Sequence, residues 1–350
     1  MSYQKPTFRH PQLPQNGLDL TRSAYEGLIS TLCAGCGHDS ISTAVIQACW
    51  ELDLEPHRIA KVSGIGCSSK SPTYFLEKSH GFNSVHGRMP SVATGASVAN
   101  HELTYIGVSG DGDSASIGMG QFAHVVRRNL NMLYLVENNG CYGLTKGQDS
   151  ATADEGNKSR TGFENPFENI DLVGVALEIG ATFVARSFSG DKDQLVPLMK
   201  AAISHKGFAL IDVISPCVTF NNHNGSTKSY DYTRDHVYTG NIIDFVPSRE
   251  EITAQYDSGD TMLLDLHDGS SLKLAKTHPD HDPTDRRAAN EALQNSRENN
   301  QILTGLIYID AHTPDFHEVM SLNKAPLNRL KQEQLCPGNE KLQSLNDGFR

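Results

Sequence analysis

Short apolar runs recur along the first two thirds of the chain, and segments with helical periodicity separate them. The runs are bounded by Gly, Asn or Ser, which is typical of buried strands, whereas apolar positions three or four apart predict helices. We expect strands at 58–64, 103–110, 131–138, 182–188 and 208–214. We expect helices at 39–54, 117–130, 170–179 and 191–204. Strands that alternate with helices favour the α/β class, a parallel sheet flanked by helices on both faces.

The pattern changes near residue 240. We expect a Pro-rich arm at 1–30, the α/β domain at 31–240, and an irregular C-terminal extension at 241–350 that contacts another subunit. Within the extension, 261–276 reads as a hairpin because an Asp-Gly pair separates two stretches of alternating apolar residues. A polar helix is expected at 283–300.

Charge and composition exclude two classes of partner. The chain has 41 Asp and Glu against 30 Lys and Arg, a net charge of -11, so it lacks the basic excess that neutralises nucleic-acid phosphates. No apolar run approaches the roughly 20 residues of a membrane-spanning helix. The N-terminus shows no apolar signal core, so we expect a cytoplasmic protein.

The most informative motif is Gly110-Asp111-Gly112, which ends a predicted strand and opens a helix. The next strand ends at Asn138-Asn139. Parallel order brings Asp111 and Asn139 to the carboxyl edge of neighbouring strands, where open α/β sheets bind ligands. Carboxylate and amide oxygens suit Mg²⁺, and the glycines let the backbone approach a diphosphate. Two unrelated turns are the alternative interpretation.

Four of the seven cysteines lie in predicted loops. Cys33 and Cys36 form a Cys-x-x-Cys, and Cys67 and Cys217 each follow a predicted strand. The odd number of cysteines in a chain of this length does not resemble a disulfide framework. Four thiolates suit either zinc or a cubane iron–sulfur cluster, and the residues alone leave both open. Cys49 is expected on the core face of a helix.

Six motifs taken together carry a family resemblance. They are CAGCGH (33–38), GIGCSSK (64–70), HGRMPSVATG (86–95), GDGD (110–113), CYGLTKGQ (141–148) and SPC (215–217). In combination they resemble the β-subunit of 2-oxoacid:ferredoxin oxidoreductases, most closely those that use 2-oxoglutarate. The resemblance runs from about Leu32 into the C-terminal region. It implies the diphosphate-binding domain of the thiamine-diphosphate-binding fold.

The resemblance also implies cofactors and site residues. One [4Fe–4S] cluster would be held by Cys33, Cys36, Cys67 and Cys217. Mg²⁺ would be held by Asp111, Asn139 and the backbone carbonyl of Cys141. Thiamine diphosphate would contact Gly66, Ser68, His86, Gly110, Gly112, Asp113 and Thr145. Lys70 and Leu144 would line the substrate pocket, and Lys70 would pair with the distal carboxylate of 2-oxoglutarate.

The implied reaction is the reversible, coenzyme A-dependent oxidative decarboxylation of 2-oxoglutarate to succinyl-CoA, with electrons passed through the cluster to ferredoxin. Thiamine enzymes need a glutamate from a pyrimidine-binding half, and the sequence contains no second α/β half. An α-subunit would supply both, in an α2β2 assembly. The alternatives are a sibling enzyme for pyruvate or branched-chain 2-oxoacids, a non-redox thiamine-diphosphate decarboxylase with structural zinc, and an assembly subunit without cofactors.

Overall fold

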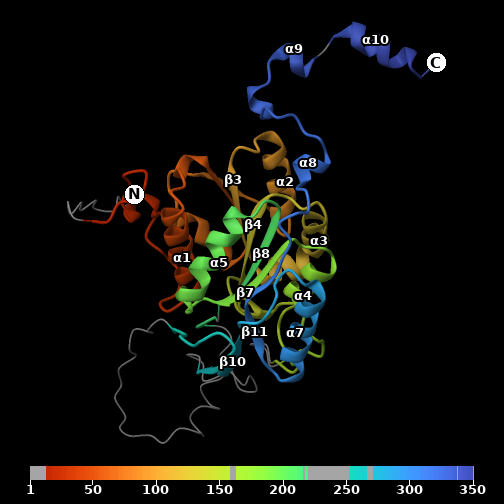
Figure 1. The fold of residues 1–350 in the computed structure, drawn as a ribbon. Helices are drawn as coiled ribbons and strands as arrows, with labels where there is room; N and C mark the ends of the chain where they lie inside the picture. Colours follow the sequence, from red (N-terminus) through yellow and green to blue (C-terminus); the bar gives the residue numbers. More distant parts are fainter. Residues whose placement is uncertain are drawn as a thin grey trace, which may run out of the picture.

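A sheet of nine strands runs through the centre of the chain (Figure 1). The computed structural model describes residues 13–157, 163–215, 217–219, 252–265, 271–336 and 338–349. The strand order is β2-β1-β3-β4-β8-β7-β11-β10-β9. The bounds are β1 (Ile59–Ser63), β2 (His80–Asn83), β3 (Thr104–Gly110), β4 (Met132–Asn138), β7 (Phe183–Phe188), β8 (Phe208–Ile214), β9 (Thr261–Asp265), β10 (Ser271–Lys276) and β11 (Ile302–Ile309). The six strands from β2 to β7 in this order are parallel, which confirms the predicted class.

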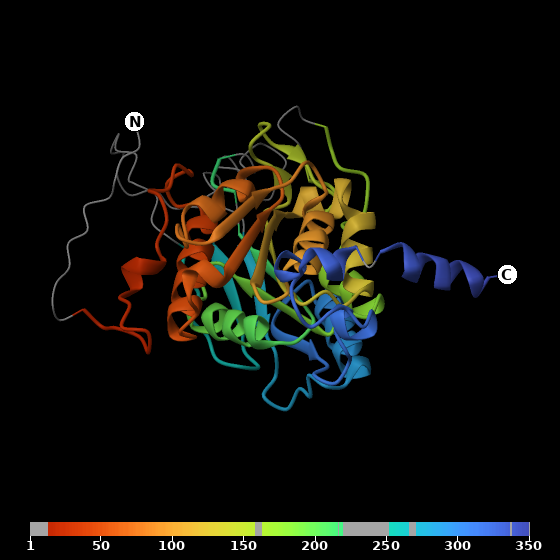
Figure 2. The ribbon, with the colours of Figure 1, turned by 90° about the horizontal axis from the view of Figure 1, so that it is seen from above.

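Helices cover both faces of this sheet (Figure 1, Figure 2). One face carries α1 (Gly37–Glu51) and α5 (Lys192–Ser204). The other carries α2 (Met89–Ala99), α3 (Met119–Arg127), α4 (Leu172–Glu178) and α7 (Arg286–Glu298). Among the described residues, no helix is long and apolar enough to cross a lipid bilayer.

Strand β4 shows why the strands read as continuous apolar runs. Leu133 and Leu135 pack into the cluster under α1 and α5, whereas Tyr134 and Val136 pack into the cluster on the opposite face. Successive side chains of a strand point to opposite faces, so a strand covered on both sides needs apolar residues at every position. Glu137 follows Leu135 by two positions and therefore faces α1 and α5.

The C-terminal part contains more regular structure than the irregular extension that the sequence predicted. β11 pairs antiparallel with β7, β10 pairs parallel with β11, and β9 pairs antiparallel with β10. The expected hairpin at 261–276 is thus present, although its Asp-Gly pair at 268–269 lies outside the described residues, as does the expected boundary near 240. Helices α9 (Gln332–Leu335) and α10 (Asn339–Asp347) extend away from the sheet (Figure 1).

The helix expected at 117–130 begins later than predicted. A π-helical turn (Gly112–Ile117) follows β3, and α3 begins only at Met119. A Cβ on Gly118 would lie 2.6 Å from the carbonyl oxygen of Asp113 and 3.0 Å from the Cα atom of Gly87. The chain therefore makes a tight turn against the 86–88 loop before α3 starts, and apolar periodicity does not record that turn.

A buried lysine fixes the segment that follows β1. Lys61 is only 7% exposed, and its ammonium donates hydrogen bonds to the carbonyl oxygens of Pro72 (2.6 Å), Phe75 (2.7 Å) and Leu76 (3.0 Å). Burial lowers the pKa of Lys61 to about 8. The three carbonyl acceptors anchor the end of the 3-10 helix η3 (Cys67–Thr73), which carries Cys67 and Lys70.

An ion-pair cluster joins β7, β8 and α4. Arg186 Nε lies 3.0 Å from Asp212 Oδ2 on the neighbouring strand, and the same guanidinium bonds Asp171, the N-cap of α4. Arg297 Nη2 lies 2.7 Å from Asp171 Oδ2. Burial acts to raise the pKa of Asp171, but Arg186 and Arg297 outweigh it and hold that pKa below its ordinary value.

We expect Arg186→Met to lower the free energy of unfolding by about 3–5 kcal/mol, because it leaves the buried carboxylate of Asp212 without its cation and Asp171 with Arg297 alone. The measurement is chemical denaturation of the purified chain. The exposed pair Arg287–Glu291 on α7 provides the control, since Arg287→Met should cost no more than about 0.5 kcal/mol. Equal losses in the two variants would contradict this account of the cluster.

Candidate functional site

The carboxyl edge of the parallel strands gathers the predicted cation ligands. Asp111 follows β3 and is 1% exposed, and Asn139 follows the adjacent strand β4. Asp111 Oδ1 accepts a hydrogen bond from the backbone N–H of Asn139 (3.3 Å), and Oδ2 accepts from Thr152 Oγ1 (2.6 Å) and from Ser150. Burial raises the pKa of Asp111, while the two hydroxyls act to lower it. The structure therefore brings the two residues together, as the strand order required.

The loop after β4 folds back on the amide of Asn139. Asn139 Oδ1 accepts a hydrogen bond from the backbone N–H of Cys141 (3.1 Å), and Gly140 between them has a φ of 71°, which favours glycine. The predicted set of a carboxylate, an amide oxygen and the carbonyl of residue 141 thus comes from one compact region. These are all oxygen donors, so the residues fit Mg²⁺.

Glycines let neighbouring loops pack closely at this edge. A Cβ on Gly112 would lie 2.5 Å from ring carbons of Tyr142, whose hydroxyl donates to the Gly112 carbonyl oxygen (2.9 Å). A Cβ on Gly110 would lie 3.1 Å from Ser68 Oγ. Gly66, the residue before Cys67, has a φ of 98°. The predicted residues Gly66, Ser68, Gly110 and Gly112 therefore stand on neighbouring loops of one edge, which fits the predicted cofactor.

Asp113 holds the loop that carries His86. Its Oδ1 accepts from the backbone N–H of Gly87 (2.7 Å) and its Oδ2 from Ser109 Oγ (2.9 Å). The carboxylate thus ties the 86–88 loop to the turn after β3, while His86 itself is exposed. Both oxygens bind protein donors, so a direct contact of Asp113 with a diphosphate stays a prediction.

The predicted substrate residues lie on two different loops. Lys70 is half-buried in η3, and its positive charge acts to lower the pKa of the Cys67 thiol. Leu144 is 52% exposed in the turn between the short strands β5 (Cys141–Tyr142) and β6 (Gln148–Asp149). Thr145 in the same turn donates to Gln148 Oε1 (2.6 Å). An apolar side chain this exposed leaves room for a ligand or a partner surface, and the role of Lys70 stays a prediction.

The four predicted cysteine ligands converge on the same edge. Burial raises the pKa of the Cys36 thiol, and the nearby Cys217 adds to that effect. Burial likewise raises the pKa of Cys67, with contributions from Cys217 and Cys33. Thr219 Oγ1 lies 3.4 Å from Cys33 Sγ. Loops far apart in sequence thus place these thiols within electrostatic reach of one another, a donor set that fits either an iron–sulfur cluster or zinc.

The thiols are not in ligand geometry as they stand. Among the residues described, no three Cys, His, Asp or Glu side chains are close enough to hold a metal ion together. Cys141, expected to contribute only its carbonyl, is buried, and its thiol hydrogen-bonds with that of Cys217, which raises its pKa. A fifth thiol at this edge is a feature that motif spacing did not predict. Cys49 lies in the core of α1, as expected.

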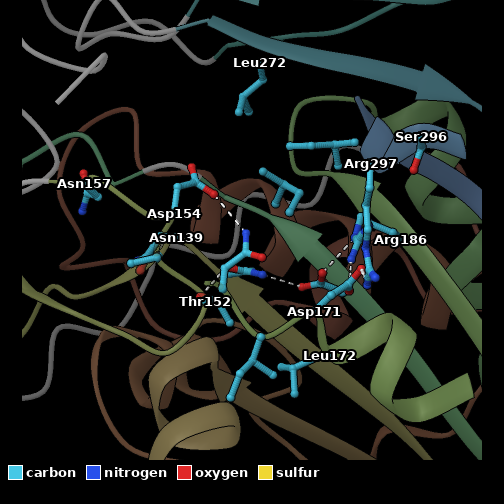
Figure 3. A pocket seen from close by; sticks show the side chains of 18 of the residues that line it. Asn139, Thr152, Asp154, Asn157, Asp171, Leu172, Arg186, Leu272, Ser296 and Arg297 are labelled. Carbon is cyan, nitrogen blue, oxygen red and sulfur yellow. Dashed lines mark hydrogen bonds and ion pairs between the residues drawn. The ribbon is translucent and has the colours of Figure 1, made fainter. Parts of the chain in front are cut away.

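Several residues of this edge escaped the sequence analysis. Ser150 and Thr152 complete the surroundings of Asp111, yet they lie in a loop without a motif. Beside Asn139 a cavity of about 220 Å³ opens between β4, β8 and α7 (Figure 3). Its polar side chains already pair with one another, as in the 3.0 Å hydrogen bonds from Asn138 Nδ2 to Asp212 Oδ1 and from Asn169 Nδ2 to Asp154 Oδ1. We therefore do not assign this cavity to the cofactor.

Comparison with known proteins agrees with this geometry. Residues 64–213 match the family model described as "Thiamine pyrophosphate enzyme, C-terminal TPP binding domain". The "2-oxoacid:ferredoxin oxidoreductase subunit beta" of Saccharolobus solfataricus is 44% identical over 200 residues, which are 57% of this chain and 65% of that protein. The matched part is thus slightly under two thirds of that relative. The "2-oxoglutarate synthase subunit KorB" of Methanocaldococcus jannaschii is 40% identical over 189 residues, 54% of this chain and 69% of that protein.

A solved structure extends the similarity over most of the chain. It is a 2-oxoglutarate:ferredoxin oxidoreductase from Magnetococcus marinus with 2-oxoglutarate, coenzyme A and succinyl-CoA bound. The TM-score is 0.70 at 29% sequence identity, and the match covers 93% of this chain and 96% of the other. The fold, the thiamine-diphosphate domain and the identity to these relatives agree. The chain belongs to the family of 2-oxoacid:ferredoxin oxidoreductase β-subunits.

Proposed function

We propose that this chain is the cytoplasmic β-subunit of a 2-oxoglutarate:ferredoxin oxidoreductase. The enzyme decarboxylates 2-oxoglutarate oxidatively, transfers the product to coenzyme A as succinyl-CoA, and passes electrons through one [4Fe–4S] cluster to ferredoxin. One observation carries the proposal: the Asp111–Asn139 site and the cysteines of three loops share one edge of the sheet. The family of the relatives supports the same reading.

The chain's own residues have distinct tasks in this proposal. Asp111, Asn139 and the carbonyl of Cys141 hold Mg²⁺, and the glycines of the 110–112 turn let the diphosphate approach the backbone. Thiamine diphosphate supplies the capacity to stabilise negative charge on the substrate carbon, and the cluster accepts single electrons. Lys70 binds the distal carboxylate of the substrate, which favours 2-oxoglutarate over pyruvate and branched-chain 2-oxoacids.

The site also calls for a second polypeptide. We infer an α-subunit that contributes the pyrimidine-binding half and the activating glutamate, in an α2β2 assembly. The exposed Leu144 and the edge strand β2, which is exposed at each of its positions and ends three residues before His86, support an interface on this side of the chain. The β-subunit names of the relatives fit such an assembly.

We expect Asp111→Asn to weaken the apparent affinity for Mg²⁺ and thiamine diphosphate by about 100-fold or more, because it removes the only charge from the proposed ligand set. Thiamine diphosphate bound to the purified protein is measured at increasing Mg²⁺. Asp257→Asn, a change at an exposed aspartate, is the control and should bind as the unaltered protein does. Unchanged binding in Asp111→Asn would refute the cation assignment.

We expect Lys70→Met to lower kcat/KM for 2-oxoglutarate relative to pyruvate by about 10- to 100-fold. A charge-assisted hydrogen bond contributes about 1.5–3 kcal/mol, and only 2-oxoglutarate loses it in the variant, because pyruvate has no distal carboxylate. Both substrates are assayed with the α-subunit present. The exposed Lys78 provides the control substitution, Lys78→Met. If the ratio stays constant, Lys70 does not select the substrate.

We expect purified protein to contain about four irons per chain, and Cys67→Ser and Cys217→Ser each to lose most of them, because each removes one of four thiolates. Iron and zinc are counted after anaerobic purification together with the α-subunit. Cys336→Ser, which changes an exposed cysteine of the C-terminal segment, should retain the iron. A colourless protein with about one zinc per chain would leave the thiamine site intact but rule out electron transfer to ferredoxin.

A further inference from the structure

A chain of buried polar side chains lies beneath the cysteines. Ser71 Oγ donates to Glu137 Oε2 (2.8 Å), and His38 Nε2 lies 3.6 Å from the same oxygen. The other ring nitrogen of His38, Nδ1, shares a hydrogen bond of 2.7 Å with Ser215 Oγ. All four residues are at most 1% exposed. We call Ser71, Glu137, His38 and Ser215 the polar bridge.

Each member of the polar bridge is close in sequence to a proposed ligand. His38 follows Cys36 by two residues, Ser215 precedes Cys217 by two, and Ser71 follows Cys67 by four. Glu137 precedes Asn139 by two residues on β4. Two hydrogen bonds and one close polar contact therefore connect the three cysteine segments with the strand that carries a proposed Mg²⁺ ligand.

Polar residues are unexpected on this face of the sheet, because helices cover it. Glu137 occupies the position after Leu133 and Leu135 on the face that α1 and α5 cover, where an apolar side chain would continue the core. Its Oε1 has no hydrogen-bond partner among the described residues. A buried polar group that is only partly satisfied costs stability, and an apolar residue of similar volume is often neutral or stabilising at such a site. The polar bridge is therefore poorly explained by stability alone.

Close backbone packing supports the same contact between loops. A Cβ on Gly37 would lie 2.6 Å from Ser215 Oγ and 2.5 Å from Ser189 Oγ. The Cys33–Cys36 loop thus reaches the segment before Cys217 only because residue 37 is glycine. The polar bridge forms where these two segments touch.

We propose that the polar bridge positions the three cysteine loops relative to one another, so that four thiolates can close around the cluster. Glu137 is the central positioning residue, because its carboxylate lies between Ser71 of η3 and His38 in the first turn of α1. The inference rests on the proposed function for the identity of the bound group. The positioning of the loops themselves is a property of the chain and can be measured without iron.

The test compares Glu137→Leu with the conservative Glu137→Gln. We expect Glu137→Leu to lose iron to a chelator about 10- to 100-fold faster than the unaltered protein, as for other residues that orient metal ligands, with no loss of thermal stability. Glu137→Gln, which keeps an oxygen acceptor for Ser71, should retain iron nearly as well as the unaltered protein. Ser187→Ala is the matched control, since Ser187 is a fully buried serine with one hydrogen bond of 2.9 Å to Gln194 Oε1.

Amide hydrogen exchange on metal-free protein separates this inference from the proposed function. Glu137→Leu should speed exchange at 33–38 and 67–71 by about tenfold or more, and Ser187→Ala should not. Unchanged exchange in Glu137→Leu overturns the polar bridge whatever the protein's iron content. Faster exchange in Glu137→Leu, together with an unaltered protein that binds no iron, would keep the positioning role and overturn the cluster instead. Iron loss that follows thermal stability across all variants would reduce the polar bridge to a packing feature.

Discussion

Parallel pairing of β1, β3, β4 and β8 is the constraint on which the rest of the site depends. Parallel strands that lie side by side end at the same edge, so the residue after each strand is delivered to one region. The loop after β1 brings Cys67, β3 brings Asp111, β4 brings Asn139, and β8 brings Cys217. The two proposed inorganic sites are neighbours because their strands are neighbours. Helix α1 then adds Cys33 and Cys36 by packing its first turn over the same edge.

Burial on both faces makes each polar side chain near this edge informative. The strands are mostly apolar, and their buried charged residues are Lys61 on β1, Glu137 on β4, Arg186 on β7 and Asp212 on β8. On the α4 face, Asp212 pairs with Arg186, a fully partnered structural cluster. On the α1 face, Glu137 bonds Ser71 and approaches His38 but leaves Oε1 without a partner in the described part of the chain. Asp212 thus has partners for its charge, whereas one oxygen of Glu137 has none among the residues that the structure describes. This difference separates a stabilising ion pair from a candidate functional residue.

The strand pattern predicted the centre of the fold because both covered faces impose apolar runs that length and flanking residues identify. The spacing from Gly110 to Asn139 likewise predicted a contact that depends only on strand order. The sequence could not predict the antiparallel addition of β11 to β7, because no local pattern records which edge a late strand joins. Nor did it predict Ser150 and Thr152 beside Asp111, or the thiol of Cys141 beside Cys217. Those contacts arise from loop conformation, which in the 86–118 region depends on glycines with no space for a Cβ.

Two kinds of positioning therefore meet at the sheet edge. Strand order determines which residues lie at this edge, and it places them to within the length of a loop. It does so for any sequence that forms this sheet. Ligand geometry demands far finer placement, because thiolates must reach common metal atoms from separate loops. Loops are the least constrained part of an α/β fold, so the added constraint must come from side chains. Lys61 anchors the end of η3 through three carbonyl groups, and Glu137 accepts a hydrogen bond from Ser71 of the same helix and approaches His38 at the start of α1. The helix that carries Cys67 and Lys70 is thus held at both its backbone and its buried face, which is the rigidity that the proposed cluster and substrate site would require.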